Sequence, residues 1–295
     1  MNYISKKDIR LPKRKKSSKK GDNGKVLVIG GSRYYVGAIS LAGLAALRSG
    51  VDWVTIAAPE KVAWCVNNLS QDIVSVKLKG DFISLKHANT IEKLAKKHDV
   101  VLIGNGIGLK AETKQFLKRI IKIKNLKVID ADGIKALSSS DFGNSIITPH
   151  IKELEIFMKN SKINDRIVKN IVQEKNIERK ALMARKAIKL LGIKNNKKNF
   201  FENNNILLLK GRIDAIISKD DILFNKTGNS GMSKAGTGDV LAGLTAGFLA
   251  QSKDLLQSAV NAAYFNGLIG DILLKKKKGF TYLASDMVEE IERIF

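Results

Sequence analysis

Short apolar runs alternate with helix-period patterns along most of this chain. Lys25 to Ile29 has the apolar character of a buried strand, Ala38 to Leu47 that of a helix rich in small residues, and Asp52 to Ala57 that of the next strand. Strand, helix and strand in this order predict a parallel βαβ unit with a right-handed crossover.

The same alternation continues almost to the C-terminal end. We expect helices at Leu85–Lys97 and Thr113–Ile123, parallel strands at Val100–Ile103, Lys127–Ile129 and Ser145–Thr148, edge strands at Ile206–Leu209, Ala215–Ile217 and Ile222–Phe224, and C-terminal helices at Asp254–Leu274 and Ser285–Ile294. Residues 160–205 are rich in Lys and Asn, with one helical stretch from Asp165 to Leu191. The pattern predicts an α/β fold with a mostly parallel, doubly wound sheet flanked by helices. Residues 1–24 form a basic leader, and 25–295, without repeat or Pro/Gly-rich linker, are expected to form a single domain.

The most informative segment is a glycine-rich loop between Thr227 and Gly243, directly ahead of an apolar helical pattern. Glycine permits positive φ and close approach of the backbone to a ligand. We expect the helix to begin at Asp239, so that its free N–H groups face the loop and bind an anion such as phosphate. The loop glycines are Gly228, Gly231, Gly236 and Gly238.

Asp239 is unusual beside a phosphate site because a carboxylate there repels the ligand. One hypothesis is that it is a general base for a substrate hydroxyl, kept ionised by the helix terminus. The alternative is that Asp239 only caps the helix, a role that Asp fills well.

Several other strand ends carry polar or glycine residues. His150 follows a strand and Pro149, and is either a ligand contact or a surface residue. Lys210 ends another strand and is either a phosphate contact or one lysine among many. Asp130 and Asp132 either hold Mg²⁺ through water or serve a turn. No His, Cys or acidic cluster has metal-ligand spacing, so no protein metal site is predicted.

Composition narrows the class of protein. A single cysteine, Cys65, excludes an intramolecular disulfide framework and suits a reducing compartment, and neither an export signal nor a membrane span is indicated, so we expect a cytoplasmic protein. The net charge of +24 raises nucleic acid as a partner, but the lysines are spread through every segment and aromatics are only 6%. We therefore expect no nucleic-acid partner.

Together, these loops resemble those of ADP/ATP-dependent NAD(P)H-hydrate dehydratases, which have a ribokinase-like fold. The resemblance covers residues 20–295, and its most specific part is the Gly-Asn-x-Gly-Met block followed by Gly-Thr-Gly-Asp. Ribokinase-like kinases share the second part alone. The motifs that match in order are Lys25–Ser32, Gly37-Ala38, Gly104–Gly108, Thr148-Pro-His150, Leu209-Lys-Gly211 and Gly228–Gly243.

The resemblance implies a repair enzyme that restores NADH or NADPH from the S-form of its hydrate, NADHX or NADPHX, coupled to hydrolysis of ADP or ATP with Mg²⁺. Asp239 would be the catalytic base. The hydrated cofactor would contact Ala38, Gly106, His150 and Asp239, and the adenine nucleotide would contact Lys210, Gly211, Arg212, Ile213, Asp214 and Gly238. It also implies a homo-oligomer, as a tetramer, and an epimerase on a separate chain.

The chain departs from the family pattern at three places. Ala235 replaces a glycine, Asn105 replaces a proline between glycines, and 151–153 replace a Pro-Gly-Glu turn. Two alternatives remain open: a ribokinase-like kinase of a vitamin precursor or sugar, and a basic nucleic-acid-binding protein.

Overall fold

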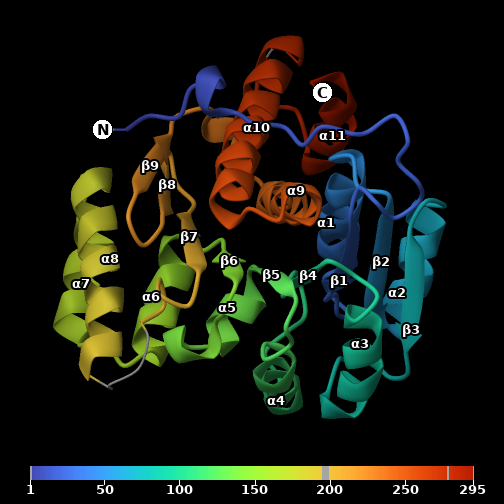
Figure 1. Ribbon diagram of the computed structural model, residues 1–295, viewed down its shortest axis with the longest axis horizontal. Coiled ribbons are helices and arrows are strands. Elements are labelled where there is room, and N and C mark those ends of the chain that lie inside the picture. Colours follow the sequence, from blue (N-terminus) through green and yellow to red (C-terminus); the bar gives the residue numbers. More distant parts are fainter. Residues whose placement is uncertain (1, 195–198, 278, 295) are drawn as a thin grey trace.

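A single nine-stranded sheet forms the centre of the fold (Figure 1). The computed structural model describes residues 2–194, 199–277 and 279–294, so four residues of the predicted 160–205 segment, 195–198, lie outside the described residues. The strand order is β3-β2-β1-β4-β5-β6-β7-β8-β9. The strands are β1 (Lys25–Ile29), β2 (Trp53–Pro59), β3 (Val74–Leu78), β4 (Val100–Ile103), β5 (Leu126–Ile129), β6 (Ser145–Ile147), β7 (Asn205–Leu209), β8 (Asp214–Ile217) and β9 (Ile222–Asn225).

Strands β1 to β7 pair in parallel, and β7, β8 and β9 pair antiparallel at one edge. The prediction of a mostly parallel, doubly wound sheet with three closely spaced edge strands is confirmed. The strand order reverses at β1, whose neighbours are β2 and β4. In open α/β sheets ligands bind at such a switch point, outside the carboxyl ends of the strands.

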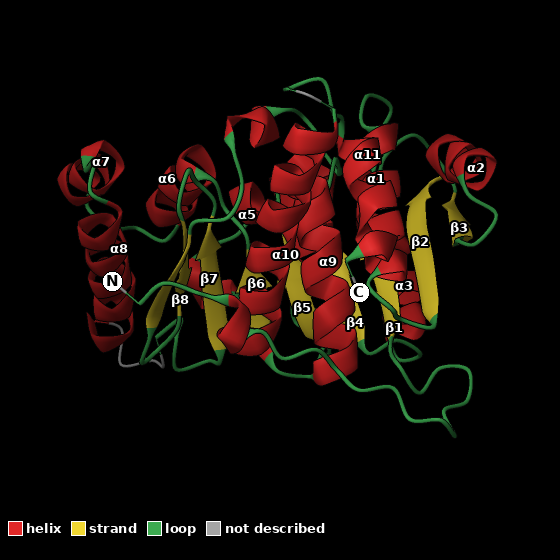
Figure 2. Cartoon of the chain, turned by 90° about the horizontal axis from the view of Figure 1, so that it is seen from above, coloured by secondary structure: helices red, strands yellow, loops and turns green. Residues whose placement is uncertain are grey.

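Helices cover both faces of the sheet (Figures 1 and 2). One layer contains α1 (Val36–Arg48), α2 (Glu60–Leu69), α9 (Thr237–Ser252), α10 (Leu255–Lys276) and α11 (Ala284–Glu290), and the other contains α3 (Ala88–Ala95), α4 (Ala111–Ile120), α5 (Asp132–Ala136), α6 (Ile151–Asn160), α7 (Asp165–Gln173) and α8 (Ile177–Lys194). Alternation along β1 supplies both cores, since Val26 and Val28 face the first layer while Leu27 and Ile29 face the second.

Helices α1 and α9 pack closely because α9 carries glycine on the contact face. A Cβ atom at Gly243 would overlap the carbonyl oxygen of Ala42, and one at Gly247 would lie 2.8 Å from the carbonyl oxygen of Ala46. The close packing holds the middle of α9, the helix that follows the glycine-rich loop, against α1.

Some elements differ from the prediction. The single helical stretch expected from Asp165 to Leu191 is wrong: it is two helices, α7 and α8, interrupted at residues 174–176. Helices α2, α5 and α6 and strand β3 were not predicted.

The basic leader packs on the rest of the chain. Ile4 is buried, and its N–H donates to the carbonyl oxygen of Phe224 in β9 (2.8 Å). Further along, the amide of Asn261 in α10 donates to the carbonyl oxygen of Arg10 (2.8 Å). The leader is therefore anchored to the edge strand and to α10. None of the described helices is long and apolar enough to cross a membrane.

Candidate active site

The glycine-rich loop leads into α9, as predicted, but the helix starts two residues earlier. Gly236, with φ 95°, is the N-cap, and the N–H of Val240 donates to its carbonyl oxygen (3.0 Å). Asp239 thus lies in the first turn, and its alternative role as N-cap is wrong. The first N–H groups of a helix have no partner within it, so this turn presents donors to an anion.

The loop ahead of α9 is tied to α10 and to the segment before α11. The N–H of Gly228 and the side-chain amide of Asn229 donate to the carboxylate of Asp271 (2.9 and 3.1 Å). Asn229 Oδ1 in turn accepts from the buried Tyr282 hydroxyl (2.8 Å). Of the four loop glycines, Gly228 and Gly236 have positive φ. The loop is therefore held in place by side chains rather than left to solvent.

Asp239 belongs to a buried polar network at the carboxyl ends of β4, β5 and β6. The Asn105 amide nitrogen donates to Asp239 Oδ1 (2.7 Å) and to Asp130 Oδ2 (2.9 Å). The Thr148 hydroxyl donates to Asp130 Oδ1 (2.7 Å). Asn105, Asp130 and Thr148 are all buried. Residues distant in the sequence meet here because parallel strands end at the same edge of the sheet.

Lys210, at the end of β7, supplies the positive charge of this network. Its ammonium lies 2.8 Å from Asp130 Oδ1 and 3.6 Å from Glu153 Oε2. A Cβ atom on Gly238 would lie 3.4 Å from Lys210 Nζ, so the ammonium faces the first turn of α9. Burial lowers the Lys210 pKa, but Asp130 and Glu153 outweigh it and the net direction is upward. A charged lysine beside free helix N–H groups is suited to a phosphate.

The pKa of Asp239 is raised to about 7, first by burial and then by the Asp130 charge, against the opposing effects of Asn105 and Lys210. We predicted that the helix terminus keeps Asp239 ionised, but burial and a second carboxylate raise its pKa to about 7, so it is only partly ionised at neutral pH. A carboxylate that titrates near neutral pH is well matched to accept a proton from a substrate.

His150 caps α6, a helix that the sequence did not predict. Its Nδ1 accepts from the N–H groups of Lys152 (3.1 Å) and Glu153 (3.3 Å), and Glu153 Oε2 accepts from the His150 N–H (3.0 Å). The His150 side chain is 48% exposed, with Nε2 3.5 Å from Glu153 Oε1. Burial also lowers the pKa of His150. The ring is thus held by Nδ1 and presents Nε2 near the site.

The other predicted substrate contacts lie at neighbouring strand ends. Ala38 is in the first turn of α1, and Gly106, with φ 63°, follows β4. A Cβ atom on Gly106 would lie 2.5 Å from Tyr35 Cβ, so this loop touches the segment that leads into α1. Tyr35 itself is 57% exposed.

The predicted nucleotide contacts after β7 form a tight connection to β8. The N–H of Gly211 donates to Asp214 Oδ1 (3.0 Å), and the Asn225 amide donates to Asp214 Oδ2 (3.1 Å). Burial raises the pKa of Asp214 to about 6. Arg212 is exposed and Ile213 is half-buried. Lys210 alone of this group reaches the buried network.

Sequence reasoning missed Thr148, Glu153 and the role of Asn105. One signal was available, because polar residues end three adjacent strands. His150-x-x-Glu153 has the spacing of a capping box, but its first residue is not the Ser or Thr that marks the pattern in a sequence.

Across the described residues, no three His, Cys, Asp or Glu side chains are grouped to hold a metal ion. Asp132 is the first residue of α5, accepts from the Gly108 N–H in the loop after β4 (3.0 Å) and pairs with Lys135 (2.8 Å). Asp130 and Glu153 are paired with Lys210. Mg²⁺ commonly binds through one or two carboxylates, waters and substrate phosphates. Asp130 and Glu153 are the carboxylates next to Lys210, so they are the ones that would face a cation arriving with a nucleotide.

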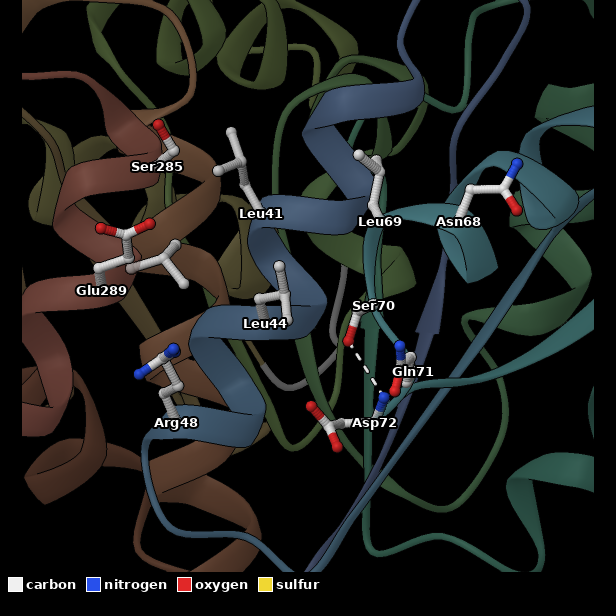
Figure 3. Close-up of a pocket in the computed structure, with 11 residues that line it drawn as sticks. Leu41, Leu44, Arg48, Asn68, Leu69, Ser70, Gln71, Asp72, Ser285 and Glu289 are labelled. Carbon is white, nitrogen blue, oxygen red and sulfur yellow. Dashed lines mark hydrogen bonds between the residues drawn. The ribbon is translucent and has the colours of Figure 1, made fainter.

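The hollow in Figure 3, with a volume of about 440 Å³, lies between α1, α2 and α11 rather than at these strand ends. Leu41, Leu44 and Arg48 of α1 line one side, and Arg48 pairs with Glu292 (2.6 Å). It contains none of the predicted site residues.

Residues 26–293 match the family model described as NAD(P)H-hydrate dehydratase. The chain is 38% identical over 288 residues to the bifunctional NAD(P)H-hydrate repair enzyme Nnr of Methanocaldococcus jannaschii, covering 96% of this chain and 50% of that protein. It is 31% identical over 294 residues to the ADP-dependent (S)-NAD(P)H-hydrate dehydratase of Cenarchaeum symbiosum, covering 97% of this chain and 94% of that protein. The chain thus spans about half the length of the bifunctional relatives and nearly all of the shorter one.

Solved structures show the same fold. The ADP/ATP-dependent NAD(P)H-hydrate dehydratase of Bacillus subtilis, co-crystallised with ATP/Mg²⁺, superposes with a TM-score of 0.74 at 25% identity, covering 96% of this chain and 92% of that one. A ribokinase-like superfamily protein from Enterococcus faecalis gives a TM-score of 0.80 at 25% identity, covering 99% and 94%. The predicted ribokinase-like fold is confirmed.

Proposed function

This chain belongs to the NAD(P)H-hydrate dehydratase family, and we propose that it dehydrates the S-form of NADHX or NADPHX to NADH or NADPH, coupled to hydrolysis of ADP. The observation that carries the proposal is Asp239, a half-buried carboxylate with a pKa near 7 in the first turn of α9, which the Lys210 ammonium faces. A proton acceptor, Asp239, and a phosphate-binding group, Lys210, would then both face the substrates at the start of α9.

Asp239 would accept the proton of the substrate hydroxyl as that oxygen attacks the terminal phosphorus of ADP. The bond between that phosphorus and the bridging oxygen breaks, and AMP leaves. The phosphate now on the substrate is a better leaving group than hydroxide. It departs with the carbon–oxygen bond pair, a proton is lost from the neighbouring carbon, and the double bond of the reduced nicotinamide is restored.

The chain's own residues would bind and orient the two substrates. Lys210 and the N–H groups at the start of α9 would hold the phosphates, with Gly211, Arg212, Ile213, Asp214 and Gly238 completing the nucleotide contacts. Ala38, Gly106 and His150 would contact the hydrated cofactor. Asp130 and Glu153 would face a Mg²⁺ ion that arrives with the nucleotide, and the ion would supply charge neutralisation of the transferring phosphoryl group. ADP as donor is supported by the Cenarchaeum symbiosum relative.

The test is the rise in absorbance at about 340 nm, the region where reduced nicotinamides absorb and their hydrates do not, when the purified chain meets S-NADHX, Mg²⁺ and either ADP or ATP. Asp239→Asn should abolish the rise, because the proton acceptor is lost. Asp254→Asn is the matched control: Asp254 caps α10, accepting from the Gln257 N–H (3.0 Å), and Asn caps equally well. No rise from the folded chain with either nucleotide would refute the proposed function.

A further inference from the structure

Asn105 has a buried side-chain amide whose nitrogen and oxygen differ in their hydrogen bonding. Its nitrogen donates to two carboxylates, Asp239 Oδ1 at 2.7 Å and Asp130 Oδ2 at 2.9 Å. Its oxygen is buried and has no hydrogen-bond partner among the described residues. Turning the amide over would place that oxygen against two carboxylate oxygens, so the observed orientation is the one that the charges require.

A buried acceptor without a partner is unfavourable for the fold, and native proteins seldom leave one. The favourable contribution of Asn105 must therefore come from the two hydrogen bonds that its side-chain nitrogen donates. Each goes to a different carboxylate, which separates two negative charges that would otherwise face each other directly.

The backbone holds Asn105 in this position. Its carbonyl oxygen accepts from the Gly31 N–H (2.8 Å), and a Cβ atom on Gly30 would overlap that oxygen. On the other side, Gly104 has φ 123°, and a Cβ atom there would overlap the carbonyl oxygen of Asp130. The main chain at Asn105 is therefore held between the ends of β1 and β5, and the two hydrogen bonds of the side-chain nitrogen orient the amide.

Asp130, the second acceptor, is itself fixed. Its Oδ1 accepts from the Thr148 hydroxyl (2.7 Å) and from Lys210 (2.8 Å). Asn105 thus connects Asp239 to a rigid anchor at the end of β5. Among the described residues, none donates to Asp239 Oδ2, so that oxygen is the one left for a substrate proton.

We propose that Asn105 is a positioning residue that fixes the Asp239 carboxylate through Oδ1, leaves Oδ2 to take the proton, and favours the ionised form. The catalytic half of this proposal rests on the proposed function, whereas the half concerning the state of Asp239 does not. Four side chains face Asp239 from the packed elements: Asn105 after β4, Asp130 after β5, Lys210 after β7 and Glu153 in α6. Of these, Asp130 and Glu153 favour the protonated form, and Asn105 and Lys210 favour the ionised one.

The experiment is a carbon-13 NMR titration of the Asp239 carboxyl in the protein without substrate, with its signal assigned from Asp239→Asn. Asn105→Leu keeps the size of the side chain and removes both donors. The titration midpoint should move to higher pH by about one pH unit or more, since a hydrogen bond to a charged group is lost. Should Asn105→Leu fail to fold, Asn105→Ala, which adds no bulk, is titrated instead, with the same expected displacement.

Asn266→Leu is the matched control. Asn266 is also buried, lies in α10, and also has an amide oxygen without a partner among the described residues. Asn266 is not among the groups that act on the Asp239 carboxyl, so its replacement removes a comparable amide and the Asp239 midpoint should stay where it is. An unchanged midpoint in the Asn105 variants, or an equal displacement in Asn266→Leu, would overturn the proposal.

A pH profile then tests the catalytic half. In Asn105→Leu, kcat/KM at neutral pH should fall about fivefold or more and recover at higher pH, because less of Asp239 is ionised near pH 7. A general loss of activity at all pH values would overturn the positioning role. A displaced midpoint in a protein whose unaltered form shows no dehydratase activity would refute the proposed function and leave the electrostatic role of Asn105 standing.

Discussion

Replacing Asp239 by Asn should stabilise the folded chain at neutral and alkaline pH while removing activity. The folded pKa of about 7 lies well above the ordinary value of 3.8 because burial and Asp130 disfavour the charge. The folded state therefore binds this proton more tightly than the unfolded state does. The free energy of unfolding must then fall as pH rises from about 4 to about 7, and remain reduced above that.

The size of the effect follows from the two pKa values. Their difference corresponds to about 4 kcal/mol at pH values above the folded pKa, and solvent screening at a partly exposed site reduces this to about 2–3 kcal/mol. Asn keeps the size of the side chain and can still accept from Asn105, so it removes the charge without leaving a cavity. The stability that Asp239→Asn gains equals the stability that the native chain loses by keeping an ionised carboxylate at this position for catalysis.

Urea unfolding of the unaltered chain and of Asp239→Asn, at about pH 4.5 and about pH 8, measures this directly. The variant should be the more stable by no more than about 1 kcal/mol at the lower pH and by about 2–3 kcal/mol at the higher pH. Asp254→Asn should show no such pH-dependent gap. A gap of equal size at both pH values, or a variant that is less stable at about pH 8, would refute the electrostatic account of Asp239.

Two further variants test the site and its backbone. Lys210→Met should weaken nucleotide binding at least tenfold in a calorimetric titration with ADP. It should also destabilise the fold by about 3–5 kcal/mol, because Asp130 and Glu153 lose their buried partner. An unchanged ADP affinity would show that Lys210 is not part of the phosphate site. Gly104→Ala should destabilise the chain far more than Gly108→Ala in thermal unfolding, because a Cβ atom overlaps the Asp130 backbone at the first position and meets nothing within 4 Å at the second, both having positive φ. Equal losses would show that positive φ alone, rather than the close approach, explains the glycine at 104.

Local patterns in the sequence were sufficient for much of the fold. The apolar run at β1, the glycine-rich loop and the small-residue helix α1 each predicted their element, because strand and helix periods are local properties. The interruption between α7 and α8 was not predicted, since both halves are polar and helical in pattern. Helix α6 was missed because its N-cap is a histidine, whereas Ser, Thr, Asp and Asn are the usual signals.

The site was predicted residue by residue but not as a network. Asp239, Lys210 and His150 were singled out from their places at loop and strand ends. The contact of Asn105 with both Asp130 and Asp239 depends on strand order, which no local pattern reveals. The raised pKa of Asp239 likewise depends on burial and on a carboxylate 109 positions away in the sequence. The roles of the predicted contacts, the compartment and the homo-oligomer stay predictions.

The relatives bear on one further expectation. The bifunctional repair enzymes are about twice as long as the segment that this chain matches, and the Cenarchaeum symbiosum dehydratase is matched over nearly its whole length. The expectation that the epimerase is a separate chain stays a prediction.

The measurement that tests the central claim most directly is the stoichiometry of products from S-NADHX and ADP in a single reaction. Inorganic phosphate and NADH should appear in a one-to-one ratio, with AMP in the same amount, because phosphoryl transfer to the hydroxyl is followed by loss of phosphate. Accumulation of a phosphorylated product without NADH would contradict a dehydratase and indicate a ribokinase-like kinase instead.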